Sequence, residues 1–281
     1  MKSPTRDRTR ALFSPALFVA VLLVLSSAFA WAEKASQELD EGVSLVASYL
    51  VQNGEFVPNP DFEAEAEGEE AEDYETVRDY IWAIVPDPIK DMIGRFDLTE
   101  ADPENDESSD GSVGLSEDDA HWEYALDFGL GASAVLDEVE EDYLAFDQVI
   151  IHELAHIIAL NATQMGGGGT YIVEEGSLKK GAYLDSFYQK FWKKQYPDWV
   201  DTGEDDPDAA AELYESHPTA FITDYAATSP NEDLAESFAS FVTEPKPAGK
   251  DEKAQKVLFF YAYPELVAYR DAMRKAMGSS K

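Results

Sequence analysis

Cysteine is absent from this chain of 281 residues, and basic residues are scarce. Without cysteine there can be no disulfide, no lipid-modified N-terminal cysteine and no latent form held by a cysteine thiolate, so the fold depends on its core alone. Lysine and arginine number 21 against 57 aspartates and glutamates, a formal net charge of -36. Such a charge repels nucleic acid and anionic lipid surfaces, so we expect neither as a partner.

Long apolar runs are confined to the N-terminus. Residues 1–32 have the pattern of a Sec-type signal peptide, with a basic start, an apolar stretch and the A-x-A sequence Ala30-Trp31-Ala32. We therefore expect a secreted or periplasmic protein that is not inserted in a membrane after signal removal. The alternative is an uncleaved anchor, because Ala11–Ala32 is nearly long enough to span a bilayer.

Signal removal makes the chain more acidic still. Residues 1–32 hold four basic residues and one acidic residue, a net +3, so the formal charge of -36 becomes -39 without them. Salt shortens the range over which the carboxylates of the chain repel one another. A chain with this charge therefore suits work in high salt. The alternative is that acidic loops merely raise the number of negative charges, without any adaptation to salt.

The pattern along the chain predicts short helices separated by acidic segments. The elements expected before residue 120 are an amphipathic helix at Glu33–Asn53, a solvated linker at Gly54–Asp73, one or two short helices at Tyr74–Phe96 and an acidic loop at Asp97–Asp119. The elements expected after it include a strand at Trp122–Phe128, a loop at Gly166–Gly169, and helices at Gly181–Tyr196 and Lys253–Met277, the last with a break at Pro264.

Residues 152–156 read HELAH and lie in an apolar segment that predicts one buried helix from about Asp147 to Asn161. Positions four apart share a helix face, so His152 and His156 can bind one metal ion through their imidazoles. Glu153 is displaced by about 100° around the axis and lies beside the ion. A zinc ion acidifies a bound water, and a carboxylate that is not a ligand accepts the proton. The alternative is a helix with two hydrogen-bonded histidines and no metal, although burying such groups without partners is costly.

Zinc hydrolases keep three protein ligands and leave the fourth position to water, so a third ligand is needed. Residues 224–238 predict a second helix on which Glu232 and Glu236 are four apart and share a face. Glu232 can bind the zinc, and Glu236 can accept a hydrogen bond from a ligand histidine. The alternative for Glu232 is a solvated acid at a helix N-terminus. His121 and His217 are weaker candidates, because one lies far from the motif and the other precedes a proline in a turn.

HELAH followed by N-E-D-L-A-E resembles the gluzincins, zinc peptidases whose third ligand is a glutamate on a second helix. The nearer likeness is to the catalytic domain of anthrax toxin lethal factor and its relatives, which have a segment close to Y-x-x-T-N-x-x-E-x-x-A-E-x-F. The residues that fill this frame are Tyr225, Thr228, Glu232, Ala235, Glu236 and Phe238. Ser229 replaces the asparagine of the frame, and the interval from His156 to Glu232 is longer than in the toxin. The toxin's delivery and recognition domains have no counterpart, so the resemblance covers about residues 145–245.

The resemblance implies an α+β, zincin-like fold that is mainly helical, with a small sheet and an active-site helix carrying HExxH. The site residues that it implies are the zinc ligands His152, His156 and Glu232, the general base Glu153, the oxyanion donor Tyr225, and Glu236 behind a ligand histidine. We then expect an acidic N-terminal region at residues 33–119 and a zinc metallopeptidase domain at residues 120–281.

The expected function is hydrolysis of peptide or protein substrates by an exported zinc peptidase. In such an enzyme the strand at Trp122–Phe128 can hold extended substrate at a sheet edge, or its aromatic residues can belong to the core. One alternative is a zinc-binding but catalytically weak envelope binding or scaffold protein, which hydrolysis of unfolded casein would distinguish. Another is an envelope protein without metal, which metal analysis would identify.

One acidic segment has the pattern of a calcium loop. Asp106–Glu117 has acidic or hydroxyl residues at its first, third and fifth positions, a glycine at its sixth and a glutamate at its last. Pro103 lies where the preceding helix of such a motif should end. A Ca²⁺ site and a mobile solvated loop are both compatible with this segment.

Overall fold

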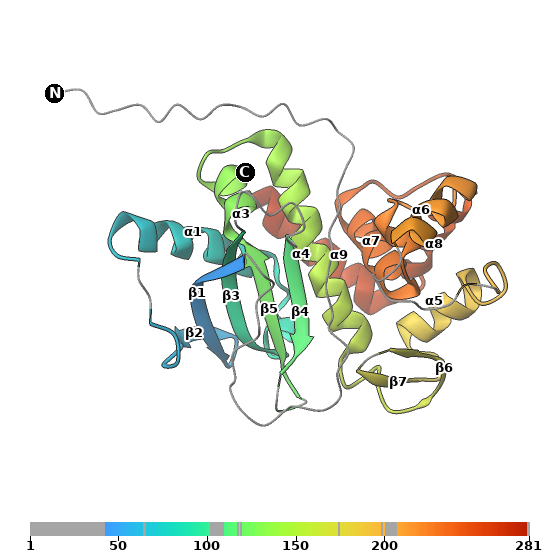
Figure 1. Ribbon diagram of the computed structural model, residues 1–281, viewed down its shortest axis with the longest axis horizontal. Coiled ribbons are helices and arrows are strands. Elements are labelled where there is room, and N and C mark those ends of the chain that lie inside the picture. Colours follow the sequence, from blue (N-terminus) through green and yellow to red (C-terminus); the bar gives the residue numbers. More distant parts are fainter. Residues whose placement is uncertain are drawn as a thin grey trace.

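The computed structural model describes residues 43–63, 66–101, 110–116, 118, 120–173, 175–197, 199 and 207–279. The signal peptide expected at residues 1–32 lies outside these ranges. Within them the fold is α+β, with one mixed sheet and a larger number of helices (Figure 1).

The main sheet has five strands in the order β2-β1-β3-β5-β4. Their bounds are β1 Val43–Gln52, β2 Glu55–Pro58, β3 Ile93–Ala101, β4 Gly111–Leu115 and β5 Trp122–Asp127. β3 and β5 are parallel, whereas the other neighbouring strands are antiparallel. The sheet therefore combines strands from both sides of the boundary expected after residue 119.

The helix predicted at Glu33–Asn53 is wrong over its described part, because residues 43–52 form β1. Asn53 and Gly54 have φ values of 54° and 75°, and Gln52 pairs with Glu55 across them. An Asn-Gly pair with two positive φ values makes a tight hairpin turn whose twist matches the strands. The helical spacing of the apolar residues favoured a helix in spite of this Asn-Gly turn. The hairpin also replaces the first part of the linker expected at Gly54–Asp73.

The acidic loop predicted at Asp97–Asp119 is wrong over most of its described part, since β3 continues to Ala101 and residues 111–115 form β4. With two glycines in five residues, β4 lacks the apolar alternation that marks a strand. The strand predicted at Trp122–Phe128 is confirmed as β5, and the core interpretation of its aromatic residues holds because Trp122 and Tyr124 are buried. β5 is an inner strand, so the edge strand on this side of the sheet is β4.

The helices follow the sequence predictions more closely. Their bounds are α1 Glu69–Ile84, α2 Asp87–Lys90, α3 Phe128–Val135, α4 Glu140–Leu160, α5 Tyr183–Phe191, α6 Pro207–Ser216, α7 Pro230–Thr243, α8 Glu252–Phe260 and α9 Pro264–Ser279. The break predicted at Pro264 is confirmed, while the loop predicted at Gly166–Gly169 is partly strand, because β6 Gly168–Val173 pairs with β7 Gly176–Lys179.

α4 is the central helix and contains the HELAH residues. It lies between the sheet and the helices that follow it in sequence, and contacts β4 on one side and α7 on the other (Figure 1). Among the described helices, α4 is long and apolar enough to cross a membrane, yet 72% of its apolar window is buried inside the fold. Its apolar surface is therefore used for packing.

A buried ion pair holds α7 in place. Lys256 Nζ on α8 lies 2.6 Å from Asp233 Oδ2 on α7, and both side chains are 0% exposed. The Trp192 indole donates to the same carboxylate oxygen at 2.6 Å, and the ammonium lies 3.9 Å from the centre of the Phe221 ring. Burial raises the pKa of Asp233 to about 6 despite the opposing charge of Lys256. Because Glu232 is the adjacent residue, this pair also fixes the position of Glu232.

We expect Lys256→Met to lower the free energy of unfolding by about 3–5 kcal/mol, because it leaves a buried carboxylate without its charge partner. Urea unfolding followed by circular dichroism measures this difference. Lys250→Met, at an exposed position before α8, is the matched control and should change stability by less than about 0.5 kcal/mol. Equal stability of the two variants would mean that the ion pair is unimportant.

Candidate metal centre

α4 and α7 bring together His152, His156 and Glu232, and one potential ligand atom of each lies within 4.8 Å of the others. Glu232 Oε2 lies 3.0 Å from His152 Nε2 and 3.4 Å from His156 Nε2. The two Nε2 atoms are 3.1 Å apart. All three side chains are buried, although His152 and Glu232 are 80 residues apart in sequence.

Glu232 reaches this position because α7 begins two residues before it. Ser229 is the N-cap of the helix, and its hydroxyl accepts a hydrogen bond from the Glu232 backbone N–H at 3.1 Å. Pro230 occupies the first turn, where its missing N–H costs nothing. Ser229 is the residue that departs from the family frame, and its hydroxyl serves as the helix cap.

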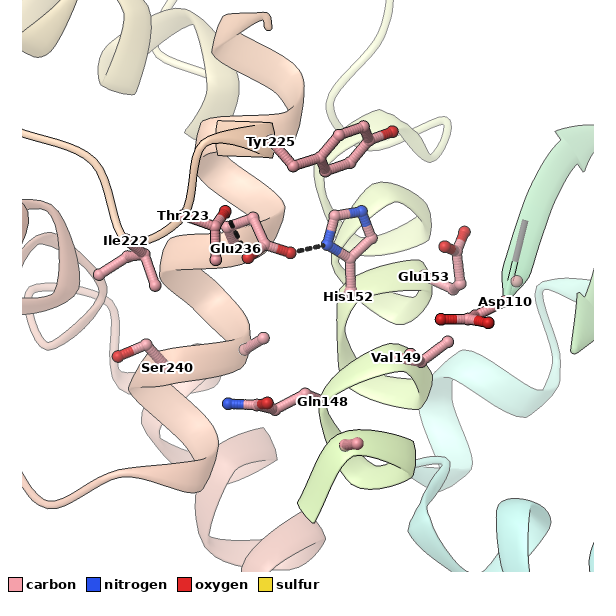
Figure 2. Close-up of a pocket in the computed structure, with 13 residues that line it drawn as sticks. Asp110, Gln148, Val149, His152, Glu153, Ile222, Thr223, Tyr225, Glu236 and Ser240 are labelled. Atoms are coloured by element: carbon pink, nitrogen blue, oxygen red, sulfur yellow. Dashed lines mark hydrogen bonds and ion pairs between the residues drawn. The ribbon is translucent and has the colours of Figure 1, made fainter. Parts of the chain in front are cut away.

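Glu236 lies behind His152 on the side away from Glu232. Its Oε1 is 2.7 Å from His152 Nδ1, and its Oε2 accepts a hydrogen bond from the Thr223 hydroxyl at 2.9 Å (Figure 2). A carboxylate at Nδ1 keeps the proton on that nitrogen and turns the Nε2 lone pair toward Glu232. Glu236 therefore sets both the orientation and the tautomer of the imidazole.

The donor atoms of this cluster fit a cation. With one proton of His152 on Nδ1, its Nε2 faces a carboxylate oxygen at 3.0 Å and the Nε2 of His156 at 3.1 Å, so this nitrogen must hold either a second proton or a metal ion. Burial opposes the charged form of His152, but hydrogen bonds to Glu232 and Glu236 raise its pKa well above the usual value. Burial also opposes the charged form of Glu232, yet the charge of His156 and the hydrogen bond of His152 lower its pKa. The surroundings thus favour positive charge, and two imidazoles with one carboxylate are a ligand set typical of zinc.

Glu153 is not part of the ligand cluster. Its side chain is only 4% exposed, and its Oε2 has no hydrogen-bond partner among the described residues. Burial raises the pKa of this carboxylate above its ordinary value. A carboxylate with a raised pKa is a stronger proton acceptor than an ordinary one, which suits a general base.

Tyr225 lies over the His152 imidazole, with ring centroids 5.9 Å apart and an interplanar angle of 38° (Figure 2). It starts the short 3₁₀ turn η2, Tyr225–Ala227, which Asp224 caps through its side chain. The structure therefore brings Tyr225 and Glu236 to the cluster from two different elements. The other candidate histidines lie elsewhere, His121 beside Asp118 and His217 beside Leu213.

A cavity of about 120 Å³ adjoins the cluster. It is lined along α4 by Ala145, Gln148, Val149, His152 and Glu153, on the opposite side by Ile222, Thr223, Tyr225, Glu236, Ala239 and Ser240, and from the sheet by Asp110 and Gly111. The positions on α4 are three or four residues apart and form one stripe of the helix. The cavity is therefore a trough between α7 and β4 with α4 as its floor.

Sequence reasoning missed the contribution of the sheet to this trough. A Cβ on Gly111 would lie 2.7 Å from Leu126 Cδ2 and 3.0 Å from Glu153 Cγ, so the lack of a side chain allows β4 to approach α4. Both Asp110 and Gly111 belong to the predicted calcium loop Asp106–Glu117, whose described part is mainly β4. Residues 106–109 and 117 lie outside the described ranges, so Ca²⁺ binding stays a prediction.

Comparison with known proteins adds little. No family model matches the chain, and no curated protein is similar to it. A solved structure from Bacteroides caccae, described as a "putative zinc-binding metallo-peptidase", is 20% identical, with a TM-score of 0.38 over 75% of this chain and 71% of the other.

Proposed function

We propose that this chain is an exported zinc-dependent peptidase. The observation that carries the proposal is the convergence of His152, His156 and Glu232 from two helices. Beside them lies the buried Oε2 of Glu153, which has no hydrogen-bond partner among the described residues. The fit to the lethal factor frame supports the finer assignment to that group of gluzincins. Export rests on the pattern of residues 1–32 alone.

His152, His156 and Glu232 would hold the zinc. When bound, the ion would polarise a scissile carbonyl and lower the pKa of a water molecule. Glu153 would act as the general base at this site and would return the proton to the leaving amine, a role that suits a buried carboxylate whose pKa is raised above its ordinary value. Glu236 keeps His152 oriented throughout through the bond to Nδ1.

Two further features would position the substrate. β4 is the edge strand beside α4, so an extended peptide can add to it and cross the trough above Glu153. Tyr225, above His152, is placed to donate its hydroxyl to the oxyanion that develops on the scissile carbonyl. The direct test is hydrolysis of unfolded casein by zinc-loaded protein.

We expect Tyr225→Phe to lower kcat by about 10²–10³-fold with little change in KM, because the hydroxyl would meet charge only in the transition state. Steady-state kinetics with one peptide substrate measures both constants. Tyr214→Phe removes a hydroxyl from a residue of α6 that does not line the trough, and should leave kcat unchanged. A Tyr225→Phe enzyme with normal kcat would make Tyr225 a packing residue.

We also propose that the protein works in high salt. The Debye length falls from about 30 Å at 0.01 M to about 3 Å at 1 M, so added salt should screen the repulsion among surface carboxylates. The melting temperature and the peptidase activity should both rise over this range. The titration uses sodium chloride at fixed calcium concentration, and a flat or falling melting temperature would leave the charge as a solubility feature.

A further inference from the structure

We propose that Asp110 binds a positively charged side chain of the peptide substrate, carried by a residue that flanks the scissile bond. This inference rests on the proposed peptidase function and names the substrate class of the same site. The trough between α7 and β4 would accept a lysine or arginine side chain, with its aliphatic part along the floor and its charge at the Asp110 carboxylate.

The position of Asp110 follows from the start of β4. Its backbone carbonyl accepts a hydrogen bond from the Asp127 N–H at 2.9 Å, which holds the residue against β5. Asp110 lines the trough together with Glu153 and Val149 (Figure 2). The next residue, Gly111, lies so near to both that an added Cβ would be 3.0 Å from Glu153 Cγ and 3.1 Å from Val149 Cγ1. A substrate side chain entering the trough beside Glu153 would therefore meet the carboxylate of Asp110.

Among the ionisable groups that line the trough, the carboxylate of Asp110 is the one available to a ligand. Glu236 is held by His152 and Thr223. The carboxylate of Asp110 has no hydrogen bond or ion pair with the described residues. None of the described lysines and arginines lines the cavity. The buried and unpartnered Oε2 of Glu153 faces the same space. The carboxylate of Asp110, which has no cation beside it from the described residues, points to a cation from the ligand.

The rest of the lining suits the stem of such a side chain. Ala145, Val149, Ile222 and Ala239 present apolar surface, while Gln148 and Ser240 add neutral polar groups. Lysine and arginine combine an apolar stem with a charged end. A purely apolar side chain would remove water from Asp110 without replacing its hydrogen bonds, and an acidic one would be repelled. The formal charge of -36 would also attract cationic peptides over a longer range.

The test compares alanine-based peptides that differ at one central residue, which is lysine, arginine, leucine, glutamine or glutamate. We expect wild-type enzyme to cleave the two basic peptides with a kcat/KM at least about 10-fold above the others, at a bond formed by the basic residue. Product masses identify the bond. Asp110→Asn should remove the preference and keep zinc content, and Asp110→Lys should favour the glutamate peptide.

The matched control is Asp87→Asn, which removes the same charge from an exposed position outside the trough and should keep the preference. Equal or better cleavage of the leucine peptide by wild type, or an unchanged preference in Asp110→Asn, would overturn the proposal. Binding of the same peptides, measured by calorimetry on zinc-loaded protein, separates the two hypotheses. Tighter binding of the basic peptides that depends on Asp110, without hydrolysis, would support the charge preference and refute the peptidase function.

Discussion

A Glu153→Gln enzyme should keep its zinc and lose its peptidase activity, with kcat reduced by about 10³-fold or more. Glutamine has nearly the same shape as glutamate but cannot accept the proton of a metal-bound water. Glu153 lies outside the cluster of His152, His156 and Glu232, so the ligand set is unchanged. Metal analysis and peptide hydrolysis on the same preparation measure the two properties separately.

The matched control for this variant is Glu215→Gln, which makes the same chemical change at an exposed position on α6. It should retain both zinc and activity. Loss of zinc in Glu153→Gln would instead mean that Glu153 is a ligand. Near-normal hydrolysis in that variant would refute the proposed mechanism.

Removal of the ligands should lower the zinc content together with the activity. We expect about one zinc per chain in the purified protein, because the site offers three protein ligands and an open position. The double variant His152→Ala, His156→Ala should hold no stoichiometric zinc and should have no peptidase activity. Glu232→Gln should weaken zinc binding and thereby lower activity at limiting zinc, whereas excess zinc should restore part of it.

Zinc binding should also raise the stability of the folded protein. A ligand that binds only the folded state adds about 2.7 kcal/mol when present at 100 times its dissociation constant, so zinc should raise the melting temperature of wild type. The double variant should show no such rise, while His121→Ala, at an exposed histidine outside the cluster, should behave as wild type. Zinc retained by the double variant, or none in wild type, would refute the metal assignment.

Much of the candidate site could be predicted from spacing because helices are local structures. His152 and His156 share a face of α4 through the repeat of the helix alone, as do Glu232 and Glu236 on α7. The helix of HELAH was underestimated at its N-terminal end, where α4 begins at Glu140. This first turn contains the acidic residues Glu140, Glu141 and Asp142, which favour a helix N-terminus.

The strands were the elements least well predicted from the sequence, because a strand depends on partners that are distant in sequence. β1 pairs with β3 across most of the N-terminal region, and β4 is a strand through its pairing with β5. Local spacing around Val43 and Leu50 favoured a helix, but tertiary pairing prevailed. The Asn53-Gly54 turn was a local signal that could have corrected the prediction.

The sequence by itself determined the chemistry that is available: two histidines on one helix face, a neighbouring carboxylate, a second acidic helix and a chain without cysteine. Only the tertiary structure decided which distant groups meet. It placed Glu232 within 3.0 Å of His152, left Asp110 at the wall of the trough, and made β4 the edge strand. The physical reason is that helix geometry acts over a few residues, whereas a site shared by two helices and a sheet edge depends on how the whole core packs.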